Sequence, residues 1–487
     1  MDPFLQPAAC TRRRFFARGA AGLSAALAST ALAENLAAAA PGAGTRPHDD
    51  PARGPHFAPR ARRVISLHME GGPSQLDLFD RKPKLADWYD QDLPDSVRGG
   101  QRLTGMTSGQ TRFPIAPSMF RWTRHDNGGD GLWLSELLPH LGSVAHELCL
   151  VRSMHTEAIN HEPAITFVQT GTQQPGRPSF GSWASYGLGT GNRDLPTFVV
   201  LITQGFGNMQ ALAARFWGNG FLPSEHQGCK LRSSGDPVLF LQDPQGLQRQ
   251  DRRAMLDLLG ELDRTTFARS LDPEVEARIA QQEMAFRMQT SVPELVDVAN
   301  EPASTWALYG EEAKRPGTFA SSCLLARRLC ERGVRFVQLY MRGWDQHGNL
   351  PAELRLQCKA IDRPIAALLT DLRRRGLLDD TLVTFGGEFG RTVYSQGGLS
   401  RDDYGRDHHP RCFSMWLAGG GVRAGHVHGE TCDHGYNIVR DPVSVHDLHA
   451  TLLHLLGFDH ERLTFRHQGR DFRLTDVAGR VVPQLLA

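Results

Sequence analysis

Six short runs of β-branched, aromatic and aliphatic residues predict buried strands along the chain. They cover residues 64–69, 148–153, 197–202, 335–341, 381–385 and 412–417. Long connections separate these runs, and helical patterns appear over 319–332, 352–375 and 445–456. In the last of them, Val445, Leu448, Leu452 and Leu455 fall on one apolar helix face. Strands that alternate with helices indicate an α/β fold with a mostly parallel sheet covered on both faces.

A polar segment interrupts this alternation. Residues 243–301 carry many charges and few strand signals, so we interpret them as a helical insertion within one domain that covers 62–487. The whole chain of 487 residues is 40% hydrophobic and 22% charged, which excludes a polytopic membrane protein, a disordered chain and a collagen-like repeat. Lys and Arg number 54 against 53 Asp and Glu, so we expect no nucleic acid partner.

The N-terminus resembles an export signal. Arg12, Arg13 and Arg14 precede two phenylalanines and a small, apolar run over 19–33. This pattern is similar to a twin-arginine signal, which would engage the twin-arginine translocation machinery and deliver a folded protein to the periplasm or the outside. The alternative is a chance basic amphipathic stretch. The run is shorter than the ~20 apolar residues of a membrane span, so we expect no span once residues 1–33 are removed. Residues 34–61, rich in Ala, Pro and Gly, predict a flexible linker.

The cysteines carry no metal or disulfide signature. Cys10 lies in the signal, and the seven others lack a C-x-x-C pair. An odd number without such a pair argues against a disulfide framework or a zinc ribbon. We expect most of them to be small buried hydrophobes.

Unusual polar residues follow the predicted strands. Glu70, Asp345 with His347, and Glu388 each come directly after a strand, and His408 with His409 precede the last one. Residues 155–162, which follow the predicted strand over 148–153, carry Thr156, Asn160 and His161. Ligands collect beyond the carboxyl ends of strands in open α/β sheets. Carboxylates and imidazoles that arrive from several strands are what a hydrolytic metal centre requires.

Each element also has a structural explanation. Glu70 before two glycines fits a strand-end turn, and Asp345-x-His347 fits a turn capped by its Asp. Glu388 lies between glycines in an apolar setting, which is hard to explain as a solvated surface acid, and the pair His408-His409 favours a functional role. The joint pattern is stronger than any of its parts.

Several longer phrases resemble a known bacterial family, domain of unknown function 1501. They are residues 68–77 (HMEGGPSQLD), 177–183 (RPSFGSW), 387–392 (GEFGRT), 405–410 (GRDHHP), 446–451 (HDLHAT) and 469–473 (GRDFR). The resemblance runs collinearly from about residue 64 to the end. The family is usually grouped with the alkaline phosphatase and sulfatase superfamily, which implies a three-layer α/β/α sandwich and a site for one or two divalent metals.

The superfamily pattern fits this sequence in part. The resemblance places Glu70 where a metal-binding Asp is usual, and Thr156 near the nucleophile position. It gives one complete metal site, from Asp345, His347 and His409, with His408 as the other choice for the last ligand. The second site is reduced to Glu70 and Glu388, because Phe389 replaces a ligand histidine. A Cys-x-Pro-x-Arg motif is missing, so a formylglycine sulfatase mechanism is not supported.

The leading hypothesis is an exported, metal-dependent hydrolase of a phosphate or sulfate ester on a small molecule or glycan. Zn, Ca, Mg or Mn would polarise the ester, Thr156 or a bound water would attack, and Asn160 or Arg391 would stabilise charge. One alternative is a non-catalytic member of the fold that binds a ligand or glycan. Another is an isomerase of the phosphomutase type.

Histidines are concentrated late in the chain. Ten of the 20 lie between 408 and 467. We expect only His409 and then His408 among them to bind metal. His446, His449 and His454 belong to a helix beside its apolar face, and His426, His428 and His434 lie in loops that could approach the site.

Overall fold

The computed structural model describes residues 54–487, apart from 127, 234, 240 and 271–272. The predicted signal over 1–33 and the linker up to residue 53 therefore lie outside the described residues. In the described part of the chain, a nine-stranded sheet has the order β12-β4-β11-β8-β1-β7-β5-β6, with β15 paired to β4. Its strands are β1 (Arg63–Met69), β4 (Leu148–His155), β5 (Phe198–Thr203), β6 (Cys229–Leu231), β7 (Phe336–Met341), β8 (Thr381–Gly386), β11 (Phe413–Ala418), β12 (His426–His428) and β15 (Val443–Ser444).

The sheet is mostly parallel. Only β11 runs against its neighbours β4 and β8, while β8, β1, β7, β5 and β6 all run the same way. All six predicted strands are present, so the expected α/β fold with a mostly parallel sheet is confirmed. Because parallel strands end at one edge, the segments after β1, β7 and β8 lie side by side.

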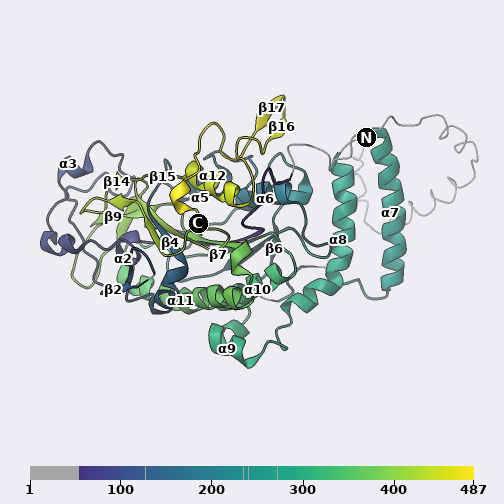
Figure 1. Ribbon diagram of the computed structural model, residues 1–487, viewed down its shortest axis with the longest axis horizontal. Coiled ribbons are helices and arrows are strands. Elements are labelled where there is room, and N and C mark those ends of the chain that lie inside the picture. Colours follow the sequence, from purple (N-terminus) through teal and green to yellow (C-terminus); the bar gives the residue numbers. More distant parts are fainter. Residues whose placement is uncertain (1–53, 127, 234, 240, 271–272) are drawn as a thin grey trace, which may run out of the picture. The chain divides into compact units, whose positions relative to one another are not determined.

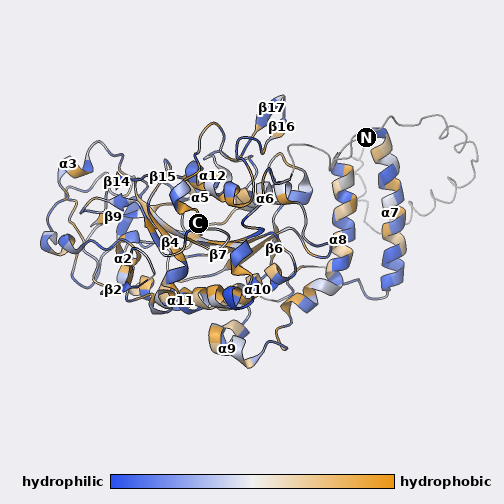
Figure 2. Cartoon of the chain, in the orientation of Figure 1, coloured by the Kyte–Doolittle hydropathy of each residue, from blue (hydrophilic) through white to orange (hydrophobic). Residues whose placement is uncertain are grey.

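Helices cover both faces of the sheet (Figure 1). One face packs against α10 (Phe319–Glu331) and α11 (Leu350–Arg374), and the other packs against α6 (Phe180–Leu188) and α12 (Val445–Leu455). Helix α5 (His161–Thr170) lies with α6 and α12 on the second face. The central strands are largely orange, and therefore apolar, in Figure 2, which agrees with burial on both sides.

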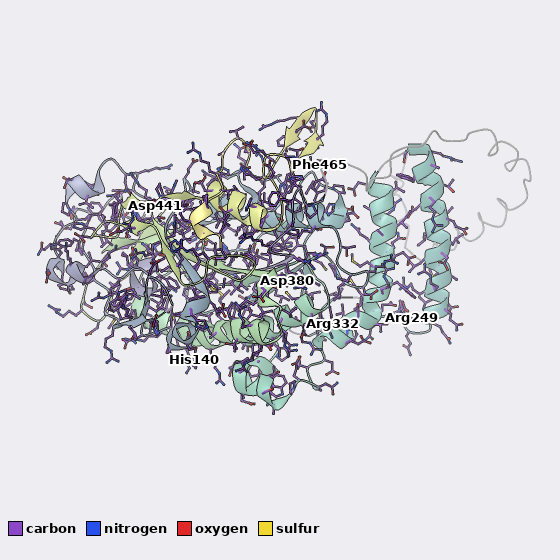
Figure 3. All side chains as sticks on the ribbon, in the orientation of Figure 1. His140, Arg249, Arg332, Asp380, Asp441 and Phe465 are labelled. Atoms are coloured by element: carbon purple, nitrogen blue, oxygen red, sulfur yellow. The ribbon has the colours of Figure 1, made fainter. Side chains whose placement is uncertain are left out.

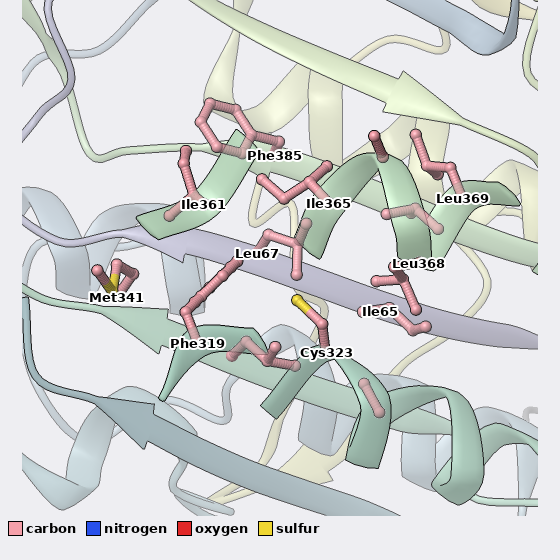
Figure 4. Close-up of a cluster of buried hydrophobic side chains, with 14 of the residues drawn as sticks. Ile65, Leu67, Phe319, Cys323, Met341, Ile361, Ile365, Leu368, Leu369 and Phe385 are labelled. Carbon is pink, nitrogen blue, oxygen red and sulfur yellow. The ribbon is translucent and has the colours of Figure 1, made fainter. Parts of the chain in front are cut away.

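Strand β1 shows how alternation divides the core. Ile65, Leu67 and Met69 belong to the apolar cluster beneath α10 and α11, whereas Val64 belongs to the cluster beneath α6 and α12. Figure 4 shows Ile65 and Leu67 against Phe319, Cys323 and residues of α11. Successive side chains of a strand point to opposite faces of the sheet, so β1 needs apolar residues at both odd and even positions. Full burial of each such side chain contributes about 1.5–3 kcal/mol.

The segment from 243 to 301 holds two long helices, α7 (Arg249–Ser270) and α8 (Pro273–Val296). Arg253 of α7 joins Glu283 of α8 through two hydrogen bonds. Arg249 marks the start of α7 in Figure 3, in which the side chains of both helices are drawn. The end of α8 is fixed to α10, because Arg328 donates to the carbonyls of Glu294 and Leu295.

The remaining elements are short. The paired strands are β2 (Trp122–His125) with β3 (Leu132–Ser135), β9 (Gly390–Ser395) with β10 (Arg406–His409), β13 (Glu430–Thr431) with β14 (Ile438–Arg440), and β16 (Phe465–His467) with β17 (Arg470–Phe472). The short helices are α2 (Gln75–Leu78), α3 (Asp95–Arg98), α4 (Pro139–Ser143) and α9 (Ala303–Tyr309). Along the described helices, no segment combines the length and the apolar character that a membrane crossing requires.

The seven described cysteines are free thiols, and five of them are buried. Burial raises the pKa of Cys149 and of Cys330 to about 12. Such thiols remain protonated and pack as small apolar groups, as expected from the sequence.

Candidate metal centre

Four side chains converge on one point beyond the ends of the central strands. Asp345 follows β7, and its Oδ1 lies 2.7 Å from His347 Nε2, 3.0 Å from His161 Nε2 and 3.4 Å from His408 Nε2. The four ligand atoms all lie within 4.8 Å of one another. His161 opens helix α5, and His408 lies in β10. The centre therefore draws on three separate segments of the chain.

Each of the three imidazole rings is oriented by an oxygen atom that contacts its Nδ1. The Nδ1 atom of His161 lies 2.6 Å from Glu388 Oε1, that of His347 lies 2.5 Å from Gln396 Oε1, and that of His408 lies 2.7 Å from the Ile159 carbonyl. An oxygen at Nδ1 holds the proton there and leaves Nε2 as the electron-pair donor. Metal-binding histidines in proteins are oriented in this way.

The donor set fits a divalent ion. A tetrahedral ion with bonds of about 2.0–2.1 Å would separate its ligand atoms by roughly 3.3–3.4 Å, so the observed Nε2–Oδ1 distances need only small adjustments. The contact of His161 Nε2 with Asp345 lacks hydrogen-bond geometry although both groups are buried. Three imidazole nitrogens and one carboxylate oxygen favour zinc or another transition metal over calcium.

The pKa values of Asp345 and His161 agree with the binding of a divalent cation at this centre. Burial alone would raise the pKa of Asp345, but its contacts with His161, His347 and His408 hold that pKa well below the ordinary value. Burial lowers the pKa of His161, yet the contacts with Asp345 and Glu388 outweigh it and raise the pKa to about 9. In the metal-free chain His161 is thus an imidazolium, and a divalent cation would take the place of its Nε2 proton.

Glu388 was expected to be a metal ligand, but it does not belong to the four-residue group and instead contacts the ligand His161. It is fully buried, and its carboxylate accepts from the Gly71 N–H at 3.0 Å and lies 3.4 Å from His68 Nε2. Burial would raise its pKa, but His161 and His68 lower it to about 2. Glu388 is therefore an ionised acceptor that holds His161, and His68 closes the other side of the carboxylate.

Glu70, the other carboxylate of the expected second site, is also held by the backbone. Its Oε1 accepts from the Gln210 N–H at 2.8 Å, and its Oε2 accepts from the Gly343 N–H at 3.2 Å. Burial and then the nearby charge of Glu388 raise the pKa of Glu70 to about 7. It does not belong to the four-residue group.

His409 points away from the centre, although it was the first histidine we expected to bind metal. Its Nε2 donates to the Tyr436 carbonyl at 2.7 Å, and its ring stacks on Tyr436 with centroids 4.2 Å apart. Adjacent residues of a strand face opposite sides, so His408 and His409 cannot both reach one ion. Burial lowers the pKa of both histidines to about 4. His408 thus occupies the place expected for His409.

The three residues expected to act on substrate take different positions. Thr156 is buried just after β4, where its N–H donates to the Pro410 carbonyl at 2.9 Å. Asn160 is exposed and immediately precedes helix α5. Arg391 is fully buried, and its three nitrogens donate to the carbonyls of Gly71, Gly72, Trp344 and Arg406 and to Asp345 Oδ1 at 2.7 Å. Its guanidinium acts on the centre through Asp345.

Sequence reasoning missed five residues of the centre. His161 is the ligand among them, and its surroundings are supplied by His68, Gln396, Asn208 and Gln210. The amides of Asn208 and Gln210 donate to Asp345 Oδ2 at 2.7 and 2.9 Å. Both follow β5, so the reasoning from strand ends applied to this strand would have pointed to them. The signal for His161 is its place in the polar segment after β4, beside Thr156 and Asn160.

The centre is open mainly on the His347 side. The side chain of His347 is 19% exposed, against 9% for His161 and 2% for Asp345 and His408. A cavity of about 820 Å³ lies at the ends of β5 and β7 and is lined by Phe206, Phe319 and Met341 among others. It contains none of the four ligands. Phe206 belongs to the same loop as Asn208 and Gln210, so this loop contributes both to the cavity and to the surroundings of Asp345.

A family model described as "Protein of unknown function (DUF1501)" matches residues 61–486. The chain belongs to the DUF1501 family. No curated protein matches this DUF1501 chain.

Solved structures similar to this DUF1501 chain include sulfatases and phosphatases. PsFucS1 sulfatase from Pseudoalteromonas sp. is 14% identical, with a TM-score of 0.35 over 82% of this chain and 69% of that one. The C-terminal periplasmic domain of EcEptC from Escherichia coli, in complex with Zn, is 10% identical, with a TM-score of 0.34 over 83% and 86%. Alkaline phosphatase from the Antarctic bacterium TAB5 is 11% identical, with a TM-score of 0.27 over 74% and 92%. These likenesses are too weak to carry residue roles over to this chain.

Proposed function

We propose that this DUF1501 protein is a metal-dependent hydrolase of a phosphate or sulfate ester. The single observation that carries the proposal is the convergence of His161, His347 and His408 on Asp345, with every Nδ1 held by an oxygen. A divalent ion bound there would supply positive charge to an ester oxygen and promote ionisation of a nucleophile.

The residues around the centre favour an anionic substrate. Helix α5 begins at His161, so the positive end of its dipole lies at the centre. Asn160 is exposed beside it and offers an amide N–H₂ to an ester oxygen. His347 marks the open side through which such an ester would enter.

Two groups could act as the nucleophile at this centre. Thr156 lies five residues before His161, and its backbone N–H donates to the carbonyl of Pro410, two residues after His408, so its hydroxyl is one source. A water molecule is the other. A free hydroxyl is a poor nucleophile at neutral pH and needs activation. Substitution of Thr156 by Ser preserves a hydroxyl, whereas Val removes it, so Thr156→Ser should stay active and Thr156→Val should not if the threonine attacks.

The test of the metal centre compares two neighbouring histidines. The His408→Ala protein should lose bound metal and hydrolysis of aryl phosphates and sulfates, while His409→Ala, matched in burial and position, should keep both if it folds. Metal content is measured by elemental analysis after native purification, and folding by circular dichroism. Wild-type protein that contains no metal and shows no turnover, unchanged by His408→Ala, would contradict the proposal. Metal binding with tight glycan binding but no turnover would favour the non-catalytic alternative.

We also propose that the protein is exported through the twin-arginine pathway to the periplasm or beyond. The arginines and the apolar run over 19–33 support this. Replacement of Arg13 and Arg14 by Lys should leave the protein inside the cell, as measured by fractionation. Unchanged export of this variant would refute the pathway.

A further inference from the structure

Arg391 occupies an unusual place for a cation. Its side chain is fully buried, and its Nη2 lies 2.7 Å from Asp345 Oδ1, the same oxygen that faces the three ligand histidines. The remaining guanidinium contacts are backbone carbonyls at the ends of β1, β7 and β9–β10: those of Gly71, Gly72, Trp344 and Arg406. A positive charge that would repel a metal ion is thus built into the wall of a candidate metal centre.

We infer that the centre holds one metal ion and that the Arg391 guanidinium is the fixed cation in the position where a second ion would bind. The inference rests on the proposed metal centre and deepens it. Asp345 is the carboxylate that both cations share. Arg391 is a positioning residue here, because it reaches the centre only through that carboxylate.

The position of the guanidinium supports a single ion. Arg391 Nη2 lies 2.7 Å from Asp345 Oδ1, and both side chains are buried, so the positive charge is screened little by water. A second divalent ion beside Asp345 would stand next to this fixed cation, and the repulsion between like charges in a buried site is strongly unfavourable.

The described carboxylates nearest to Asp345 are already engaged by other groups. The carboxylate oxygens of Glu70 are held by the N–H groups of Gln210 and Gly343, and those of Glu388 contact His161 and His68. Phe389 closes a further side, because its ring lies 4.4 Å from that of His408 and 5.0 Å from that of His161. An aromatic ring cannot bind a hard divalent cation through a lone pair.

Removal of the guanidinium should change the number of ions bound. In the Arg391→Ala protein, the four carbonyls and Asp345 Oδ1 would surround a space lined with oxygen, the ligand set that Mn²⁺ prefers. We expect the wild type to bind one equivalent of Mn²⁺ or Zn²⁺ and Arg391→Ala to bind two of Mn²⁺. Arg391→Lys keeps the positive charge and should bind one. Added guanidinium chloride at low concentration should return Arg391→Ala to one equivalent by chemical rescue.

Equilibrium dialysis with elemental analysis gives the stoichiometry, and electron paramagnetic resonance distinguishes isolated from coupled Mn²⁺. Arg327→Ala is the matched control, because this buried arginine pairs with Glu301 and Asp371 and has no described contact with Asp345; the folded variant should still bind one equivalent. Two equivalents in the wild type, or one in folded Arg391→Ala, would overturn the inference. If Arg391→Ala does not fold, the wild-type stoichiometry decides. A wild type that binds no metal would instead overturn the proposed metal centre.

Discussion

Glu70→Gln is the change whose effect on the pH dependence of stability can be worked out most directly. Glu70 is fully buried at the end of β1, and its pKa is raised from 4.5 to about 7 because burial, and then the charge of Glu388, disfavour the ionised form. Glutamine is close in shape and does not titrate. The comparison should be made on metal-free protein, in which nothing but the protein sets the charge.

The sign and size follow from linkage. The folded state holds the Glu70 proton more tightly than the unfolded state, so its contribution to stability is fully present below about pH 4.5 and is lost as the pH rises through about 7. Between about pH 5 and about pH 8, the free energy of unfolding of the wild type should therefore fall by about 2.5 kcal/mol relative to Glu70→Gln. The difference between the two proteins cancels the titration of groups that they share.

Urea unfolding followed by circular dichroism at several pH values measures this difference. Glu157→Gln, which alters an exposed acid, is the control and should follow the wild type at every pH. A wild-type minus Glu70→Gln difference that stays flat across this range would refute the buried, proton-binding state of Glu70. Saturating zinc should move the wild-type decline to lower pH, because a nearby divalent cation favours the ionised carboxylate.

Three further changes test the surroundings of the centre. Gly71 has φ of +118°, and a Cβ there would lie 2.4 Å from the Asp345 nitrogen, so Gly71→Ala should lower both the melting temperature and the metal affinity. Gln396→Ala removes the acceptor behind a ligand histidine and should weaken metal binding by about 10–100-fold in calorimetry, without unfolding the protein. Arg406→Met leaves the Asp77 carboxylate buried without its partner, and should cost about 3–5 kcal/mol in urea unfolding; a cost below about 1 kcal/mol would show that water reaches that carboxylate.

The fold was accessible from the sequence because each predicted strand is largely buried and therefore mostly apolar. Residues 64–69, 335–341 and 381–385 all coincide with central strands of the observed sheet to within a residue or two. Strand order was not accessible, because it depends on which helices cross over which face. That order, β8-β1-β7, is what brings the polar segments after these strands together.

The candidate site was only partly accessible. Asp345, His347 and His408 are among the residues expected to bind metal, and the structure brings them together. The choice between His408 and His409 depends on the pairing of His408 with Arg391 across two strands, a register that the local sequence does not specify. His161 contributes through its place at the first turn of a helix, and periodicity alone gives no sign of this.

The three chain segments that form the centre also set the order in which it can be assembled. His161 and His408 are 247 positions apart, which is the difference of their residue numbers, and Asp345 lies between them. An unfolded chain would have to close very long loops to place these side chains around one ion, at a large cost in conformational entropy. The elements that carry these side chains must therefore come together before the ion can bind with all four ligands. Once bound, the ion would fasten distant parts of the chain to one another and slow their separation, so the loaded protein should unfold more slowly than the empty one.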